Sequence, residues 1–112
     1  MSELRKGFHQ DIDSARDELV HLAASVTELI PRATAVLLDG DLEGADYLIR
    51  GDDEIDARSL DLEELCYRII ALQAPVATDL RQVVALLRMV ADIERSADLC
   101  TNICKAARRI YG

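Results

Sequence analysis

Two pairs of acidic residues in this 112-residue chain have the spacing of ligands for a metal ion. Asp52 and Asp56 are four residues apart, and so are Glu94 and Asp98. On a helix, residues at this spacing present their side chains on one face, with the oxygens about 6 Å apart. Carboxylate oxygens suit magnesium, manganese, calcium or iron, and zinc is also compatible. We therefore expect a metal site where the two helices that carry these pairs lie side by side.

The same carboxylates fall on helix faces that are otherwise apolar. At about 100° per residue, Glu94 and Asp98 project towards the apolar flank of their helix, while Asp52 falls inside the apolar stripe of the preceding one. Glu63 borders that stripe and Asn102 extends the second row by one turn, so both are further candidate ligands. An ionised carboxylate that is shielded from water costs several kcal/mol if it stays unpaired. Each therefore needs a cation, a hydrogen-bond donor or a raised pKa.

Other readings of these residues stay open. The carboxylates could line a solvated groove, or pair with Lys or Arg of another chain. Glu18 and His21 form an ExxH pair, the spacing used in carboxylate-bridged metal enzymes on helical bundles, but such sites need a second pair and the chain has one. The sequence contains no Gly-rich phosphate loop and no defensible Ser-His-Asp or Cys-His arrangement. We therefore expect a protein that is not an enzyme.

Charge and composition narrow the classes of partner. The chain has 21 acidic and 13 basic residues and a net charge of −8, which disfavours binding to nucleic acid or anionic lipid. Its start, MSELRKGF, lacks the apolar core of a signal peptide, and no apolar run approaches the roughly 20 residues of a membrane span. We expect a cytoplasmic protein with no membrane insertion, whose cysteines (Cys66, Cys100 and Cys104) are reduced and buried.

The elements that must position the carboxylates are three long amphipathic helices. Apolar residues recur at helical spacing throughout, and the expected helices span about residues 3–38, 41–72 and 77–110. Short connections make consecutive helices antiparallel. The predicted fold is an all-α, up-down-up three-helix bundle in a single domain, residues 1–112. The third helix is apolar around most of its circumference, so we expect it to lie between other elements.

Breaks and caps are predicted at three places. Pro31 is expected to bend or split the first helix near Glu28. Asp41 follows Gly40 and is a candidate N-cap for the second helix. Asp79 with Gln82 has the spacing of a capping box for the third helix.

Three motifs, in order along the second and third helices, resemble the PhoU family, the cytosolic regulators of bacterial phosphate uptake. They are GDDEID, QAPVATDLR and ADIERSADLCTNI. The last two are similar to the family patterns QPxAxDLR and DLERIGDxxxNI. The first helix agrees in length and pattern. Together the motifs are specific, and the chain resembles one three-helix repeat of the family, the N-terminal one.

The resemblance implies a helical bundle repeat that acts as an adaptor. PhoU proteins link the ATPase of the phosphate ABC transporter to a sensor histidine kinase and repress the phosphate regulon when phosphate is plentiful. Several members hold multinuclear metal clusters through E/DxxxD motifs, which match Asp52 with Asp56 and Glu94 with Asp98. Iron, zinc, manganese and magnesium are the candidate ions. The resemblance implies no catalysed reaction.

The chain departs from the family pattern in three ways. Ser59 stands where many members carry a glutamate, and Ser96-Ala97 replaces the usual Ile-Gly or Met-Gly. Family members usually contain two repeats in tandem, whereas this chain matches one. It is then either the first half of a longer protein or a single repeat that forms a homodimer and completes a six-helix arrangement. The alternatives to an adaptor are the carboxylate-bridged metal enzyme and a metal-free helical interaction module.

Overall fold

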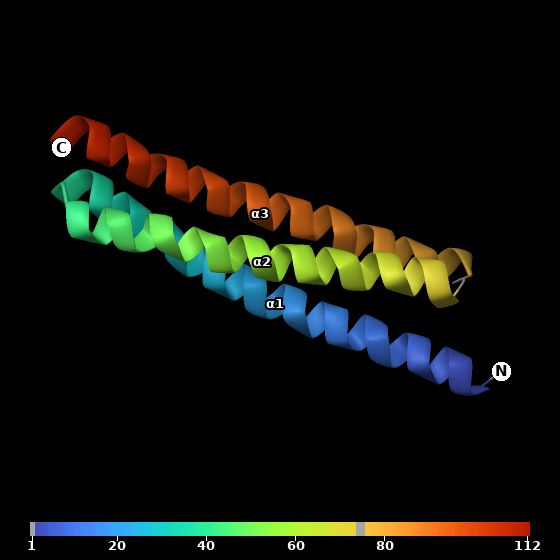
Figure 1. Cartoon of the computed structure of the whole chain (residues 1–112). Coiled ribbons are helices and arrows are strands. Elements are labelled where there is room, and N and C mark those ends of the chain that lie inside the picture. Colours follow the sequence, from blue (N-terminus) through green and yellow to red (C-terminus); the bar gives the residue numbers. More distant parts are fainter. Residues whose placement is uncertain (1, 74–75) are drawn as a thin grey trace.

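Three long helices make up nearly all of the described chain. The computed structural model describes residues 2–73 and 76–112, and the side chains of residues 6–72 and 76–112. Helix α1 spans Ser2–Asp39, α2 spans Leu42–Gln73 and α3 spans Ala77–Tyr111. They run up, down and up along a rod of 60 × 17 × 16 Å (Figure 1). The predicted all-α three-helix bundle is therefore confirmed.

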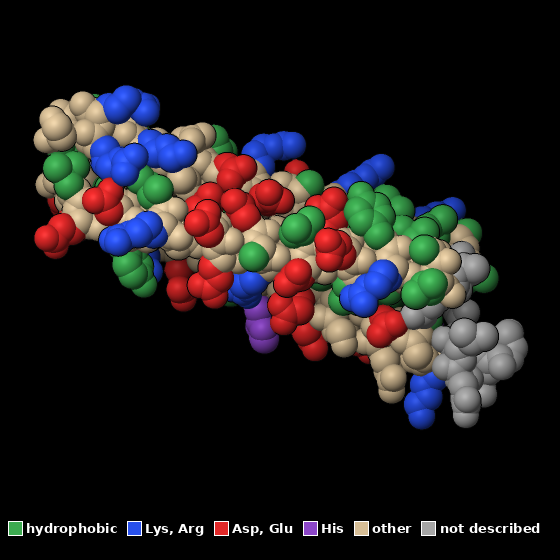
Figure 2. All heavy atoms as spheres, viewed as in Figure 1, with side chains coloured by type: hydrophobic (Ala, Val, Ile, Leu, Met, Phe, Trp, Pro, Cys, Tyr) green, Lys and Arg blue, Asp and Glu red, His purple; other side chains and the backbone are tan. Residues whose placement is uncertain are grey.

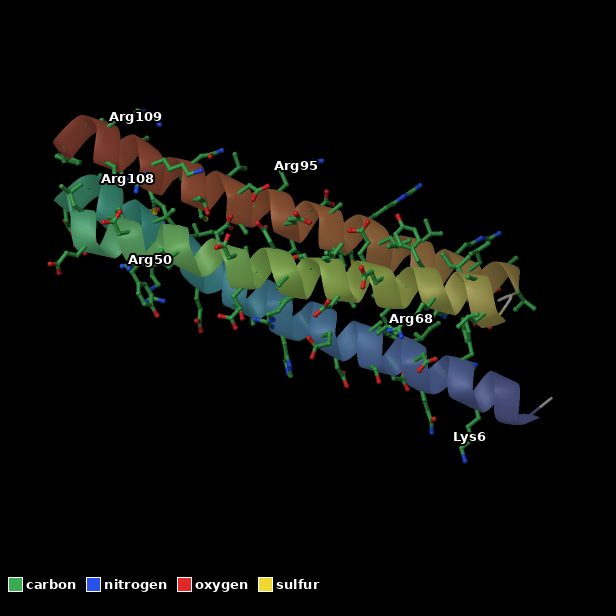
Figure 3. The ribbon with its side chains drawn as sticks, in the orientation of Figure 1. Lys6, Arg50, Arg68, Arg95, Arg108 and Arg109 are labelled. Atoms are coloured by element: carbon green, nitrogen blue, oxygen red, sulfur yellow. The ribbon has the colours of Figure 1, made fainter. Side chains whose placement is uncertain are left out.

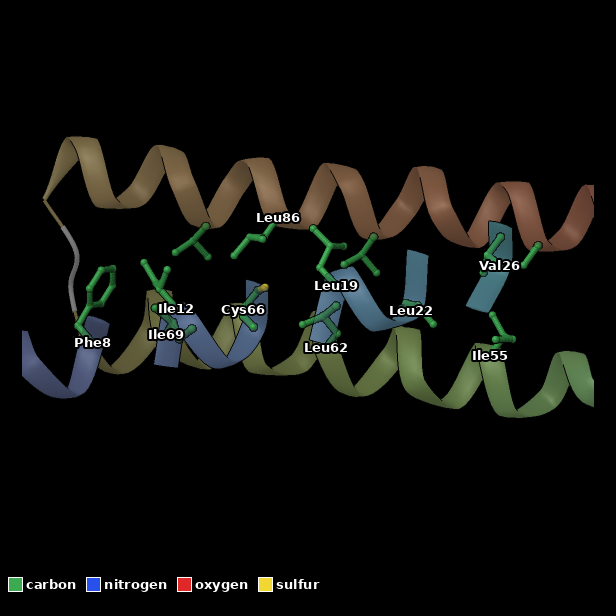
Figure 4. Packing of buried hydrophobic residues seen from close by; sticks show 14 residues of the cluster. Phe8, Ile12, Leu19, Leu22, Val26, Ile55, Leu62, Cys66, Ile69 and Leu86 are labelled. Atoms are coloured by element: carbon green, nitrogen blue, oxygen red, sulfur yellow. The ribbon is translucent and has the colours of Figure 1, made fainter. Parts of the chain in front are cut away.

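The core follows the helical periodicity of the sequence, because each helix buries one apolar stripe against the other two. Figure 4 shows the larger of two clusters of buried side chains, which fills the part of the bundle around Leu22, Cys66 and Val90. A smaller cluster lies near the α1–α2 turn and contains Cys100 and Cys104. All three cysteines are free and buried, as predicted. Burial raises the pKa of each thiol, which keeps it protonated and unreactive.

The α1–α2 turn is fixed by backbone geometry and two hydrogen bonds that involve side chains. Gly40 has a φ of +67°, a left-handed conformation that ends α1 and that glycine adopts without steric cost. The Asp41 carboxylate accepts a hydrogen bond of 2.9 Å from the Gly44 amide, so the predicted N-cap of α2 is confirmed. The Tyr111 hydroxyl donates to the Leu37 carbonyl at 2.9 Å and ties the end of α3 to this turn.

The predicted cap of the third helix is wrong, and the predicted split of the first helix does not occur. Helix α1 runs through Pro31 as one element. Pro31 is exposed, so the Thr27 carbonyl that loses its helical partner lies at the water-facing side of α1. Helix α3 begins after Val76, which is extended and makes no side-chain cap. Asp79 is therefore the third residue of the helix and not its N-cap, so the predicted capping box with Asp79 as the first residue is wrong.

The third helix is not enclosed by the other two. It packs on both α1 and α2, but it keeps a solvent-facing side with exposed arginines and the exposed apolar residues Leu80, Met89 and Leu99. Within one bundle, three helices each cover only part of the others, so α3 is only partly covered by α1 and α2. Assembly with further helices stays a prediction.

Candidate metal centre

Acidic side chains gather between α2 and α3, about halfway along the bundle (Figure 2). Because the two helices are antiparallel, the first half of α2 lies beside the second half of α3. Asp52 and Asp56 come from successive turns of α2, and Asp98 comes from α3. One carboxylate oxygen of each lies within 4.8 Å of the other two. Three of the four residues at E/DxxxD spacing therefore meet in space.

Two oxygens of this group lack the hydrogen bonds that buried polar atoms normally make. Oδ1 of Asp52 and Oδ1 of Asp56 are shielded from water and have no hydrogen-bond partner. Leaving such an atom unpaired costs about 1–3 kcal/mol, and more when it is charged. No Lys or Arg among the described side chains forms an ion pair with Asp52, Asp56 or Asp98. The three carboxylates thus have no counterion among the described side chains.

Glu94 and Glu63 belong to the same electrostatic group. Burial raises the pKa of Glu94, and the negative charges of Asp56, Asp98, Glu63 and Asp52 raise it further. Burial likewise raises the pKa of Asp56, and nearby carboxylates add to the effect. Both pKa shifts have the same physical causes, since each carboxyl is partly shielded from water and like charges are close. A bound cation would lower both pKa values, because it favours the ionised forms of the carboxyls.

The other sequence candidates lie outside this group. Asn102 is exposed, one turn beyond Asp98 on α3. Glu18 and His21 are exposed on α1 and are not part of it. Asp92 is exposed on α3, and its Oδ1 lies 3.9 Å from Nη1 of Arg95.

The burial of Ser59 was not predicted from the sequence motif. It is fully buried, with 0 % of its surface exposed, and its Oγ has no hydrogen-bond partner. It follows Asp56 by three residues, so it continues the same row of α2 one turn further towards Glu63. The sequence signal was the spacing Asp52, Asp56, Ser59, Glu63, which repeats every three or four residues on one helix face.

The donor set fits a hard cation. Two oxygens on opposite sides of a Ca²⁺ ion lie about 4.8 Å apart, since each Ca²⁺–oxygen distance is about 2.4 Å, and smaller ions need only slightly shorter spacings. Small rotations of the three carboxylates would bring their oxygens to the spacing that Ca²⁺ or a smaller ion needs. The described group contains no thiolate and no imidazole, which favours magnesium, calcium, manganese or iron over soft ions.

Comparison with known proteins places this arrangement in a family. The PhoU domain matches residues 19–107, which run from about the middle of α1 through nearly all of α3. The chain belongs to the PhoU family. The acidic face of its α2 and α3 is therefore a feature of a PhoU domain, and the resemblance in the three sequence motifs is confirmed.

Several relatives carry the same description. A phosphate-specific transport system accessory protein PhoU homolog of Aquifex aeolicus is 36% identical over 98 residues, which are 88% of this chain and 44% of the relative. PhoU homolog 2 of Mycobacterium tuberculosis is 36% identical over 106 residues, 95% of this chain and 50% of the relative. PhoU of Serratia marcescens is 29% identical over 100 residues, 89% and 41% of the two chains. The chain spans about half the length of the curated relatives it matches.

The described part of this PhoU domain contains no helix that is long and apolar enough to cross a membrane.

Proposed function

We propose that this chain acts as an accessory protein of phosphate-specific transport, as a non-catalytic adaptor on the cytoplasmic side. Support comes from the PhoU domain match and from relatives named as accessory proteins of that transport system. The adaptor links the transporter's ATPase subunit to a sensor histidine kinase through protein contacts. The exposed apolar side chains of Val20, Leu80 and Met89 offer surface for such contacts.

The observation that carries the metal part of the proposal is the convergence of three carboxylates with two unpaired oxygens between α2 and α3. Asp52, Asp56 and Asp98 would hold one divalent or iron-type cation, and the charges of Glu94 and Glu63 would add to the negative potential around it. The cation supplies the positive charge that the site lacks. Asp52 and Asp56 orient their oxygens from α2, and Asp98 joins α3 to them, so the bound ion would also fasten the two helices together.

The first test measures metal content. Protein purified without a metal-affinity column is analysed by mass spectrometry beside Asp52→Asn/Asp56→Asn and a control, Asp61→Asn, whose side chain is exposed on α2. We expect stoichiometric metal in the parent chain and the control, and none in the double variant. The proposal fails if the parent chain stays metal-free after incubation with iron, manganese, magnesium and zinc.

The second test measures the adaptor role separately. The chain is expressed in bacteria that lack their own PhoU protein and carry a reporter of the phosphate regulon. We expect it to restore repression when phosphate is plentiful. A folded chain that leaves the reporter fully active in high phosphate would contradict the adaptor proposal, whatever the metal content.

Self-association is tested by sedimentation. We expect a homodimer, or pairing with a second repeat, through the exposed side of α3. A strict monomer at high concentration would rule out the homodimer.

A further inference from the structure

A groove of about 480 Å³ runs between α1 and α2, on the side of α2 away from the carboxylates. Its floor is apolar and is formed by Leu29, Leu48 and Ile55. Three arginines line it, Arg32 from α1 and Arg50 and Arg58 from α2. Two of the three arginines of α2 therefore face this groove, although the chain as a whole has a net charge of −8. Arg50 and Arg58 therefore place positive charge on this side of α2, a helix whose other charged residues are mostly acidic.

Arg58 is a half-buried cation without a carboxylate partner. Its Nη1 donates a hydrogen bond of 3.3 Å to Ser25 Oγ across the groove, and that hydroxyl in turn donates to the His21 carbonyl at 3.0 Å. A guanidinium has five N–H donors, so one bond to a hydroxyl leaves most of them available. Among the described side chains, no carboxylate forms an ion pair with Arg58. A partly desolvated charge of this kind is stabilised by an anion that comes from outside the chain.

The other two arginines are held at the same groove. The Arg32 guanidinium lies 5.6 Å from the ring centre of Tyr47, which fixes it between α1 and α2. Arg50 projects from the side of α2 opposite α3, and its Nε donates to the Asp46 carbonyl at 3.3 Å, which leaves the terminal nitrogens free (Figure 3). Two glutamates, Glu28 and Glu54, also line the groove, but neither forms an ion pair with the three arginines, and the groove keeps a net positive charge.

Gly51 gives an independent reason to expect a ligand here. It lies in the interior of α2, where glycine costs about 1 kcal/mol relative to alanine. A Cβ at this position would meet nothing within 4 Å, so the packing of this chain does not require a glycine. The missing side chain opens the groove beside Arg50. Glycine is used where a ligand must approach the backbone closely.

We propose that this groove binds a small multivalent oxyanion, with two or more phosphoryl or carboxylate groups held by Arg32, Arg50 and Arg58. Guanidinium groups pair with both kinds of oxyanion through parallel N–H···O bonds. The apolar floor and the Tyr47 ring contact the non-ionic part of the ligand. Binding of the anion needs no metal, because the proposed metal site at Asp52, Asp56 and Asp98 lies on another side of α2.

The test is calorimetric titration of the chelated, metal-free chain with pyrophosphate and, separately, with citrate. We expect one molecule of at least one anion to bind per chain. Arg58→Gln should weaken binding about tenfold or more, since it removes charge-assisted hydrogen bonds. Gly51→Leu should weaken it to a similar degree by filling the groove, while the circular dichroism spectrum stays unchanged. Arg68→Gln, which removes one positive charge of α2 outside the groove, should change affinity less than about twofold.

The two anions distinguish a phosphoryl from a carboxylate ligand. Absence of binding by both at millimolar concentration would overturn the proposal, and so would equal weakening by Arg68→Gln and Arg58→Gln. Asp56→Asn, which removes a carboxylate of the metal centre, should leave anion binding intact. Loss of metal binding and loss of anion binding are therefore separate outcomes.

Discussion

Replacing Asp56 by asparagine removes the central charge of the three clustered carboxylates while it keeps the shape of the side chain. The repulsion between two unit charges 4.8 Å apart is about 0.9 kcal/mol in bulk water and about 3.5 kcal/mol at an effective dielectric constant of about 20. Asp56 faces two such neighbours, Asp52 and Asp98. The asparagine amide can also donate to the unpaired Oδ1 of Asp52.

Two effects reduce this gain. Asp98 is exposed, so water screens its charge, and part of the repulsion between Asp52 and Asp56 persists in the unfolded chain because they are four residues apart. We therefore expect Asp56→Asn to raise the free energy of unfolding of the metal-free protein by about 1–2 kcal/mol, which is about 4–8 °C in Tm for a domain of this size. The variant gains stability at the expense of the proposed cation site.

The assay is urea unfolding of chelated protein, followed by circular dichroism and repeated after adding the ion found in the metal analysis. Asp61→Asn is the matched control, and its stability should stay within about 0.5 kcal/mol of the parent chain. Added metal should stabilise the parent chain and not Asp56→Asn, because only the native site binds the ion. If metal-free Asp56→Asn is no more stable than the parent chain, the carboxylates are not in repulsion and the reasoning is refuted.

Three further outcomes can be checked by thermal unfolding of the metal-free chain. Folding raises the pKa values of Asp56 and Glu94, so the folded state binds protons more tightly than the unfolded chain. The stability should therefore rise as the pH falls from 7 towards their ordinary pKa values of 3.8 and 4.5. Glu94→Gln should flatten this rise, and a Tm that falls from pH 7 to pH 5 would contradict the prediction. Gly40→Ala should lower stability by about 1–2 kcal/mol, since φ is +67° and the new Cβ would lie 3.1 Å from the Tyr111 ring; an unchanged Tm would mean that the turn relaxes. Gly51→Ala should raise stability by about 1 kcal/mol, because its Cβ meets nothing within 4 Å, and a loss of stability would show that the helix needs glycine there.

Much of the fold was predictable because helical periodicity is local. Apolar residues recur at three- and four-residue spacing along each helix. Leu22, Leu62 and Val83, one from each helix, belong to these apolar stripes, and all three are buried. The Asp41 cap was predictable for the same reason, since it depends on a few adjacent residues. The cap of α3 was not, because the helix begins after Val76, and a single Asp-x-x-Gln spacing does not fix the residue at which a helix begins.

The sequence by itself determined which carboxylates share a helix face, because Asp52 with Asp56, and Glu94 with Asp98, are fixed by 3.6 residues per turn. Only the tertiary structure decided that Asp98, rather than Glu94, places an oxygen within 4.8 Å of both aspartates of α2, since this depends on the register of two antiparallel helices. The same packing buried Ser59 and left Arg32, Arg50 and Arg58 around an open groove. Periodicity gives the direction of a side chain from its own helix, and the partner it meets is set by how the helices are aligned along the bundle.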